Sequence, residues 1–352
     1  MQRDAPSFGR GSVTCRVAVI EGVGAYIPPT IVTNAQLSEQ LDTSDEWIRR
    51  MTGIQSRNHN GVDSATSDLA AEAGRRAMAH AGVQAVDMVI LATSTPDFRC
   101  PATAPSVAAM IGLGTVPAFD VAAVCAGFVY ALALGNSVIR SQMADRVLVI
   151  GADSFTSIVD PNDRKTAVIF GDGAGAVVLG AADGNCGGIL ATDLGSDGSF
   201  AHLIRVPAGG ARAFSSSDPT MFDNPYFEME GKQVFAEAVK AMTESSKRVL
   251  KGAEWSNDTV DHLIAHQANL RILNIVADNL GISRDRAVLH LDKVGNTSAA
   301  SIPLAMAYAA PRIQQGQRLL LTAFGGGTAW GSVALTWSNN YALEGVSNVG
   351  DI

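Results

Sequence analysis

Short apolar segments alternate with helical segments along almost the whole chain, and this alternation constrains the fold more than any other feature. Asp87–Thr93, Arg146–Ala152 and Arg318–Phe324 are short apolar runs of the kind that form strands buried on both faces. Longer stretches with helical character, such as the Ala-rich Ser67–Ala81, separate these runs. Strands that alternate with helices predict an α/β fold in which helices cover a sheet.

The same reasoning predicts elements along most of the chain. The expected strands are Arg16–Val23, Asp87–Thr93, Ala118–Val121, Arg146–Ala152, Gly175–Gly180, Gly188–Leu194, His262–His266, Arg318–Phe324 and Gly331–Trp337. The expected helices are Ser67–Ala81, Ala104–Ile111, Cys125–Ser141, Glu228–Leu250, Asn269–Leu280 and Ser298–Ala310. A further helix start is expected at Thr43–Glu46, because hydroxyl and acidic residues cap helices.

Two glycine-rich segments, one in each half of the chain, resemble each other. Phe170–Leu179 and Phe324–Leu335 each follow an apolar stretch and lead into a strand. This repetition predicts an internal duplication. We expect one half over residues 16–186 and the other over residues 187–340.

The composition limits the classes of function. Of 352 residues, 47% are apolar and only 17% are charged, which indicates a large buried surface and fits a subunit interface. The formal net charge of −8 argues against a general nucleic-acid binder. The most apolar stretch, Val121–Gly135, is too short to span a bilayer. We therefore expect neither nucleic acid nor a membrane as a partner.

The four cysteines, at positions 15, 100, 125 and 186, lack the paired spacing of a zinc site or a disulfide framework. We therefore expect no bound metal and a reducing, cytoplasmic location. Residues 1–10 lack the apolar core of a signal peptide and are expected to form a flexible tail. The polar residues after Ser338 are expected to form a surface extension.

Cys125 is the candidate nucleophile. A single cysteine in an apolar run is most often a small core residue. Cys125, however, lies between an expected strand and an expected helix, where the amides of a helix N-terminus favour a thiolate. Gly127 follows closely and leaves room for a substrate.

His266 and Asn296 are the candidate polar partners. His266 ends an expected strand, where a histidine is often structural, but Gln267-Ala268-Asn269 follows and brings several polar groups together. His262 has the same strand alternation without such a motif and is interpreted as structural. Asn296 could be a helix N-cap, a position that asparagine favours. A thiol, an imidazole and an amide can together transfer an acyl group and stabilise an oxyanion or a carbanion.

The run Gly325–Gly327 is either a simple turn or a place where backbone N–H groups bind an oxyanion, because glycine lets a ligand approach the chain. Phosphate-binding motifs fit less well. Gly22-Val23-Gly24 lacks the third glycine of a dinucleotide fingerprint, and no GxxxxGK[ST] motif occurs.

Taken in order, seven motifs are similar to those of β-ketoacyl-acyl-carrier-protein synthase III, a family of condensing enzymes in the thiolase superfamily. The resemblance runs from about Arg16 to Trp337. The matching segments are Thr43–Ile48, Thr52–Ile54, Cys125–Phe128, Phe170–Gly175, His266–Asn269, Gly295–Pro303 and Phe324–Gly327. The resemblance implies a thiolase-like fold of two duplicated halves in α/β/α/β/α layers, and a homodimer.

The resemblance also implies a ping-pong reaction that initiates fatty acid or polyketide biosynthesis. Cys125 would take an acyl group from an acyl-CoA, with the N–H groups of Cys125 and Gly326 as the oxyanion hole. A malonyl thioester on acyl carrier protein would then bind. His266 and Asn296 would donate to its thioester carbonyl and stabilise the enolate left when CO2 departs. No metal or redox cofactor would take part.

Further roles follow from the resemblance alone. Trp47 matches the residue that stacks on the adenine of CoA, and Arg164 matches an arginine of the same site. Asn269 and Gly231 would lie at the pantetheine arm. Phe324 matches the aromatic residue beside the nucleophile.

Four positions, in three parts of the chain, depart from the family pattern. Met51 stands where an arginine is common, with Arg50 as a possible substitute. The carrier-docking helix keeps Arg271, but Asp278 and Asn279 stand where some members of the family have lysines, which would weaken the contact with an acidic carrier. Cys100 stands where the family has a bulky aromatic residue before the proline, here Pro101. By the resemblance, this loop would reach the acyl pocket of the neighbouring subunit in a dimer. A smaller side chain there predicts tolerance of primers larger than acetyl.

Three other readings compete with condensation. An acyltransferase on the same scaffold would move an acyl group to a non-malonyl acceptor, but it would not need both His266 and Asn296. A non-catalytic partner subunit would not need Cys125. A thiolytic reaction would need a second reactive cysteine near the glycine run, and the sequence has none there.

Overall fold

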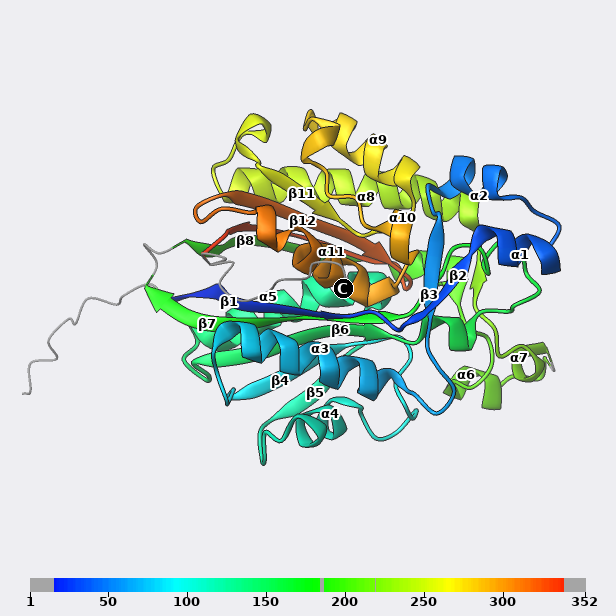
Figure 1. Ribbon diagram of the computed structural model, residues 1–352, viewed down its shortest axis with the longest axis horizontal. Helices are drawn as coiled ribbons and strands as arrows, with labels where there is room; N and C mark the ends of the chain where they lie inside the picture. The colour runs from blue at the N-terminus through cyan, green and yellow to red at the C-terminus, as the bar shows by residue number, and fades with distance from the viewer. Residues whose placement is uncertain (1–15, 184–186, 219, 339–352) are drawn as a thin grey trace, which may run out of the picture.

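Two large β-sheets lie one above the other in the computed structural model, which describes residues 16–183, 187–218 and 220–338 (Figure 1). The tail expected at residues 1–10 and the extension expected after Ser338 lie outside these described residues. In the described part of the chain, no helix has the length and hydropathy to cross a bilayer.

The first sheet has the strand order β1-β7-β6-β4-β5. β4 runs parallel to both β5 and β6, whereas β7 is antiparallel to its neighbours β1 and β6. The strand bounds are β1 Arg16–Tyr26, β4 Met88–Ala92, β5 Ala118–Val121, β6 Arg146–Asp153 and β7 Gly173–Asp183.

The second sheet repeats this topology with one strand fewer. Its order is β8-β13-β12-β11, with β11 parallel to β12 and the other pairs antiparallel. The bounds are β8 Gly188–Ser196, β11 His262–Ala265, β12 Arg318–Gly325 and β13 Ala329–Thr336. Next to β11, in the place that β5 has in the first sheet, a single parallel bridge joins Leu263 to Ala287. The matching topologies agree with a duplication, while the boundaries 16–186 and 187–340 stay a prediction.

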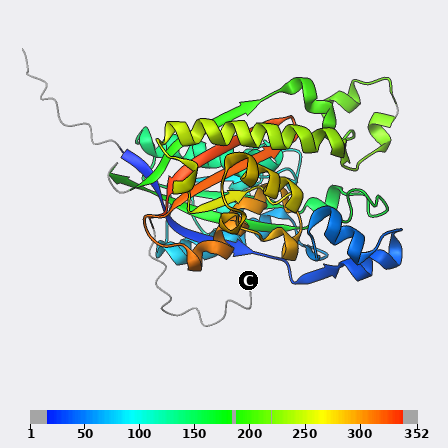
Figure 2. The same ribbon diagram turned by 90° about the horizontal axis from the view of Figure 1, so that it is seen from above.

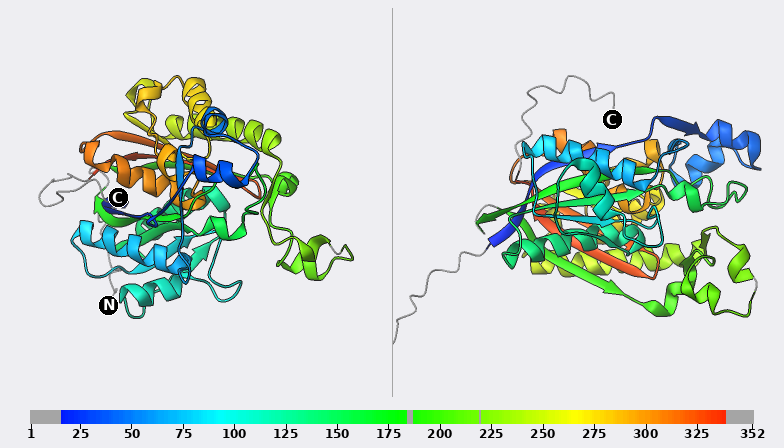
Figure 3. Two further views of the ribbon diagram at one scale, coloured as in Figure 1. Left: turned by 45° about the vertical axis from the view of Figure 1, so that its right-hand side comes forward. Right: turned by 90° about the horizontal axis from the view of Figure 1, so that it is seen from below.

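Helices complete five layers, which can be followed in Figures 1 and 3. α5 and α11 contact both sheets and therefore lie between them, while α3 and α4 cover the outer face of the first sheet and α8 and α9 that of the second. The bounds are α3 Thr66–Ala81, α4 Ala104–Ile111, α5 Gly127–Arg140, α8 Gly231–Gly252, α9 Leu270–Leu280 and α11 Ser301–Ala309. This is the layered α/β architecture that the sequence predicts.

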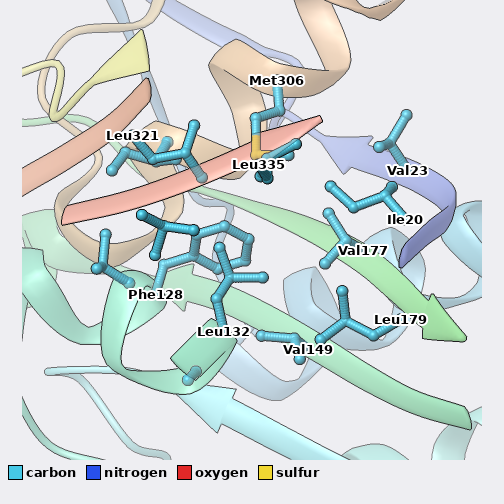
Figure 4. Close-up of a cluster of buried hydrophobic side chains, with 14 of the residues drawn as sticks. Ile20, Val23, Phe128, Leu132, Val149, Val177, Leu179, Met306, Leu321 and Leu335 are labelled. Atoms are coloured by element: carbon cyan, nitrogen blue, oxygen red, sulfur yellow. The ribbon is translucent and has the colours of Figure 1, made fainter. Parts of the chain in front are cut away.

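The main core fills the space between the two sheets (Figure 4). Phe128 and Leu132 of α5 and Met306 of α11 pack there against both sheets, for example Val177 of β7 and Leu335 of β13. All five side chains are fully buried. Each large apolar side chain buried in this way contributes about 1.5–3 kcal/mol, so the two halves stabilise each other.

Two excursions project from the same end of the sheets (Figures 1 and 2). The first consists of β2 Thr30–Thr33, α1 Asn34–Gln40, α2 Asp45–Thr52 and β3 Ser56–His59. The second consists of β9 Ile204–Arg205, α6 Ala211–Phe214, α7 Thr220–Asp223 and β10 Glu228–Met229. The short helix α10, Leu291–Val294, packs against β3. The carboxyl ends of β5, β6, β11 and β12 point to this end, where ligands bind in open α/β sheets.

Some predicted boundaries are wrong in an informative way. Cys125 does not open a long helix but lies in a 3-10 turn, Val124–Ala126, and α5 begins at Gly127. Ser298 likewise lies in a 3-10 turn before α11. Val124 and Ser298 have φ values of 47° and 51°, which an α-helix cannot include. The helix predicted from Glu228 begins only at Gly231, because Glu228–Met229 pairs with β9.

Candidate active site

The residues expected to carry the chemistry meet at one end of the molecule. Cys125 follows β5, His266 follows β11, and Phe324 and Gly325 end β12. These residues line one small cavity of about 50 Å³ together with Asn296. Cys125 and Asn296, which are 171 positions apart in the sequence, therefore line the same cavity.

Cys125 is held in a strained turn. The preceding residue, Val124, has a φ of 47°, a conformation costing a β-branched residue about 1–3 kcal/mol. The Cys125 sulfur lies 3.7 Å from the Ser298 hydroxyl. Although part of Cys125 stays accessible, burial of the sulfur raises the pKa of the thiol to about 12, the Asp153 carboxylate adds to this, and the Ser298 hydrogen bond opposes it.

Burial thus opposes the thiolate that the amides of a helix N-terminus were expected to favour. Removal of water from around the sulfur is the largest cause of the raised pKa, since a thiolate loses its hydration while the neutral thiol loses little. Cys125 also lies two residues before the first residue of α5. The resting nucleophile is therefore a thiol.

The raised pKa of the Cys125 thiol predicts how the rate of its alkylation depends on pH. Below the pKa, each pH unit raises the thiolate fraction tenfold, so alkylation of Cys125 by iodoacetamide should accelerate about tenfold per unit between pH 7 and 9, without a plateau. The rate is measured by mass spectrometry of the peptide that contains Cys125. The exposed Cys100 gives an internal comparison in the same digest. A plateau near pH 7 would contradict the buried-thiol interpretation.

His266 is almost fully buried at 4% exposure. Its Nδ1 atom lies 2.7 Å from the Ser301 hydroxyl, and its backbone N–H donates to the carbonyl of Thr322. Burial lowers the pKa of the imidazole to about 3. The ring is therefore neutral at physiological pH, with one N–H to donate. His262 instead bonds Gln317, in keeping with its structural interpretation.

Asn296 has a defined amide orientation. Its Oδ1 accepts from the backbone N–H of Ser298 at 2.9 Å, so its NH2 group is the end that remains for the cavity. Its backbone pairs with Ile169 and Gly171, which ties it to the Phe170–Gly175 motif. The alternative that Asn296 caps a helix is thus partly right, since its side chain accepts from a backbone amide of the following turn. The same hydrogen bond leaves the two N–H groups of its side-chain amide for the site.

The glycine run packs against the nucleophile turn. A Cβ on Gly325 would lie 2.8 Å from the backbone N of Cys125 and 2.9 Å from the carbonyl O of Ala123. A Cβ on Gly326 would lie 2.9 Å from Ile204. Glycine is therefore needed here for the close approach of two chain segments, a reason that the sequence analysis did not give for Gly325.

Gly325→Ala should consequently displace the nucleophile turn, because its methyl group would meet backbone atoms that cannot rotate away. Overpacking of this kind costs about 1–3 kcal/mol. We expect a lower Tm in thermal unfolding and an acyl-loading rate reduced about tenfold or more. Gly198→Ala is the matched control, because its methyl group meets nothing within 4 Å. An unchanged Tm and loading rate for Gly325→Ala would contradict the packing argument.

The structure brings Arg164, from the segment between β6 and β7, against Trp47 of the first excursion. The guanidinium of Arg164 lies 5.3 Å from the Trp47 ring centroid, and it donates to the carbonyl of Asp42 at 2.7 Å. Both residues border the open end of the fold, as expected for a nucleotide-binding pair. Met51 does not offer a charge here, and Arg50 is exposed beside Glu46.

The other predicted residues lie around α8 and α9. Asn269 is the N-cap of α9: its Oδ1 accepts from Arg271 N, and its Nδ2 donates to the carbonyl of Met51. Gly231 is the first residue of α8. Phe324 is buried in the cavity wall, and the Arg271 guanidinium lies over the Phe235 ring.

The structure shows the neighbours or the exposure of the residues at two of the places where the chain departs from the family pattern. Asp278 is paired with Arg284 at 2.5 Å, so its charge is balanced within the chain, while Asn279 lies near Thr243. Cys100 is exposed on its loop and precedes a cis proline. Phe98 of the same loop is 67% exposed, an apolar side chain that the sequence analysis did not consider.

A second cavity, of about 410 Å³, adjoins the first. The two share the walls Val124, Ile204 and Phe227. Phe155 and Ile158 add further apolar wall. The nucleophile thus has an apolar space next to it.

Several polar groups lie behind the site that no motif of the sequence singles out. Asp153, fully buried at the end of β6, accepts from the backbone N–H groups of Ser94, Thr95 and Ala299. The available signal was its position, an acidic residue at the end of a strand that is apolar from Val147 to Ala152. Ser298 and Ser301 lie within the matched Gly295–Pro303 motif, but nothing in the sequence indicated their contacts. Across residues 16–183, 187–218 and 220–338, no three His, Cys, Asp or Glu side chains cluster as a metal site would require.

Comparisons with known proteins agree with this geometry. Residues 119–198 match the family model 3-oxoacyl-[acyl-carrier-protein (ACP)] synthase III, and residues 250–337 match the model of its C-terminal part. β-Ketoacyl-[acyl-carrier-protein] synthase III 3 of Streptomyces coelicolor is 52% identical over 327 residues, covering 92% of this chain and 98% of the relative.

Solved structures are similar over almost the whole chain. The crystal structure of 3-oxoacyl-(acyl carrier protein) synthase III from Pseudomonas aeruginosa PAO1 has a TM-score of 0.86 and 46% identity, covering 92% of this chain and 99% of that one. The priming β-ketosynthase from the R1128 polyketide biosynthetic pathway has a TM-score of 0.87 and 31% identity, covering 94% and 99%. The chain therefore belongs to the β-ketoacyl-[acyl-carrier-protein] synthase III family of condensing acyltransferases, which have the thiolase fold.

Proposed function

We propose that this protein condenses an acyl-CoA primer with malonyl-acyl carrier protein by a ping-pong mechanism and so initiates fatty acid or polyketide biosynthesis. The observation that carries the proposal is the meeting of Cys125, His266 and Asn296 around one cavity, next to an apolar space of about 410 Å³. An acyl group on Cys125 could extend into that space while the malonyl thioester occupies the first cavity.

In the first half-reaction, the Cys125 sulfur attacks the thioester carbon of the primer. The carbonyl oxygen becomes an oxyanion, which the N–H groups of Cys125 and Gly326 stabilise. Collapse of this intermediate breaks the bond to the CoA sulfur, and the proton of the Cys125 thiol leaves with CoA. Acyl-Cys125 remains.

In the second half-reaction, His266 Nε2–H and the Asn296 NH2 group donate to the thioester carbonyl of the malonyl group. As CO2 departs, its bonding electron pair forms an enolate whose oxygen these donors stabilise. The enolate carbon attacks acyl-Cys125, and the sulfur leaves as a thiolate that takes up a proton. A neutral imidazole suits this role, because it donates without protonating the carbanion. The chemistry needs no cofactor.

The nucleotide of CoA would bind at the pair Trp47 and Arg164, by stacking on the indole and by attraction of the phosphates. Its pantetheine arm would pass Asn269 and Gly231 to reach Phe324 and Cys125. The carrier protein would dock near Arg271, where the Asp278–Arg284 pair offers little net charge. We therefore infer partner-specific docking rather than general attraction of an acidic carrier.

A homodimer and a cytoplasmic location complete the proposal. The low charged fraction and exposed apolar side chains such as Phe98 and Phe119, the latter on the edge strand β5, support a subunit interface. Analytical ultracentrifugation at micromolar concentration should give twice the chain mass.

The deciding experiment incubates the purified protein with acyl-CoAs, follows intact mass, and then adds malonyl-acyl carrier protein. Acyl loading followed by CO2 release and a 3-ketoacyl product would support the proposal. Loading without CO2 release, with transfer of the acyl group to another nucleophile, would favour the acyltransferase alternative instead.

The primer prediction concerns the loop that carries Cys100. We expect propionyl-, butyryl- or branched acyl-CoA to be used at least as well as acetyl-CoA, because a small side chain at Cys100 leaves volume in the partner's acyl pocket. Cys100→Phe should then shift the ratio of kcat/KM values toward acetyl-CoA. Faster reaction with acetyl-CoA than with every longer primer would refute this. In that case Phe98→Ala tests whether the neighbouring phenylalanine fills the pocket instead.

A further inference from the structure

Ser301, the first residue of α11, makes a buried contact that the reaction as described does not use. Its hydroxyl lies 2.7 Å from His266 Nδ1 and also accepts from the backbone N–H of Gln267 at 3.3 Å. Ser301 and His266 are 2% and 4% exposed, so water does not compete for these bonds.

The donors and acceptors around Ser301 favour one tautomer of His266. The Gln267 N–H can only donate, so it occupies a lone pair of the Ser301 oxygen. The hydroxyl still has one proton, and the nitrogen Nδ1 of His266 is the other partner that the structure places within reach. If Ser301 donates to Nδ1, the single proton of the neutral imidazole must lie on Nε2.

We propose that Ser301 is a positioning residue that holds His266 in the Nε2–H tautomer, so that the imidazole faces the malonyl thioester with a donor rather than a lone pair. The inference rests on the proposed function for its catalytic consequence, but the tautomer itself is a property of the resting protein.

The loop Gly295–Pro303 would then orient both donors of the second half-reaction. Asn296 is turned by the backbone N–H of Ser298, and His266 is set by the hydroxyl of Ser301. Both constraints come from one rigid segment, because residues 296–301 are all at most 5% exposed. The Cys125 sulfur has a different partner, so acyl loading should not depend on Ser301.

The test compares the unchanged protein with Ser301→Ala. Selectively 15N-labelled histidine distinguishes the tautomers, since protonated and unprotonated ring nitrogens have well-separated chemical shifts. We expect Nε2–H in the unchanged protein and a mixture in the variant. The kcat of malonyl-thioester decarboxylation should fall about 10–100-fold, within the range for a lost or misoriented oxyanion donor, while Cys125 loading stays within about twofold.

Ser246→Ala is the matched control, because it removes another fully buried serine hydroxyl whose partner is Ser332, away from the cavity. Ser301→Thr, which keeps the hydroxyl, should restore most of the lost rate. If Ser301→Ala does not fold, Ser301→Cys replaces it, with a weaker donor of similar size.

Unchanged decarboxylation together with an unchanged tautomer in Ser301→Ala would overturn the proposal, as would Nδ1–H in the unchanged protein. Absence of CO2 release from the unchanged protein would be a failure of the proposed function alone. The chemical shifts of His266 would still decide whether Ser301 sets the tautomer.

Discussion

Cys125→Ala should abolish acyl loading, so that no mass increase is seen with any acyl-CoA. Without a sulfur no covalent intermediate forms, and condensation should fall by at least about 10⁴-fold, as for the loss of other covalent nucleophiles. Decarboxylation of the malonyl thioester should continue within about tenfold, because its donors, His266 and Asn296, do not depend on the sulfur. Intact mass spectrometry and CO2 release measure the two half-reactions separately.

Cys186→Ala serves as the control for thiol removal, because Cys186 lies in none of the functional motifs. It should load as the unchanged protein does. Continued loading of Cys125→Ala at a comparable rate would place the nucleophile elsewhere and refute the proposed mechanism.

Asn296→Asp should have the opposite effect to Cys125→Ala: acyl loading should continue, and decarboxylation of the malonyl thioester should be lost. The aspartate can still accept from the Ser298 N–H, so the loop should keep its shape. Its other oxygen, however, presents a lone pair and negative charge where the amide presented donors. Loss of one such donor costs about 10²–10³-fold in kcat, and repulsion of the developing enolate adds to it. We expect decarboxylation to fall by at least this factor, with loading within several-fold.

Asn257→Asp makes the same chemical change outside the cavity, at a side chain that donates to the carbonyl of Leu280. It should affect stability but neither half-reaction. Decarboxylation by Asn296→Asp at a near-normal rate would remove Asn296 from the mechanism.

The local pattern of residues was sufficient for the strands, and together with the family resemblance it pointed to three residues that line one cavity in the structure. The run Arg146–Ala152 is apolar at nearly every position, which only a strand buried on both faces explains, and β6 lies there. Cys125, His266 and Asn296 were found because each follows an apolar strand or a glycine and has polar or small neighbours. Such signals lie within a few residues, where sequence patterns are informative.

The start of α5 could not be predicted in the same way. The helical pattern includes Cys125 and gives no reason to exclude it. Only the packing of Gly325 against the turn, with 2.8 Å between a virtual Cβ and Cys125 N, shows why the chain bends there. Val124, with a φ of 47°, lies in this turn, and Gly325 and Gly326 from the other half of the chain pack closely against it.

The sequence by itself determined the layered α/β fold, the family and the three polar side chains of the candidate site, because strand patterns and motifs are local. The tertiary structure alone decided the protonation states and partners. Cys125 meets Ser298 across 173 positions, and Asp153 meets Ala299 across 146. Burial shifts the pKa of Cys125 up and that of His266 down. Desolvation depends on everything packed around a group, and residues distant along the chain supply most of that packing.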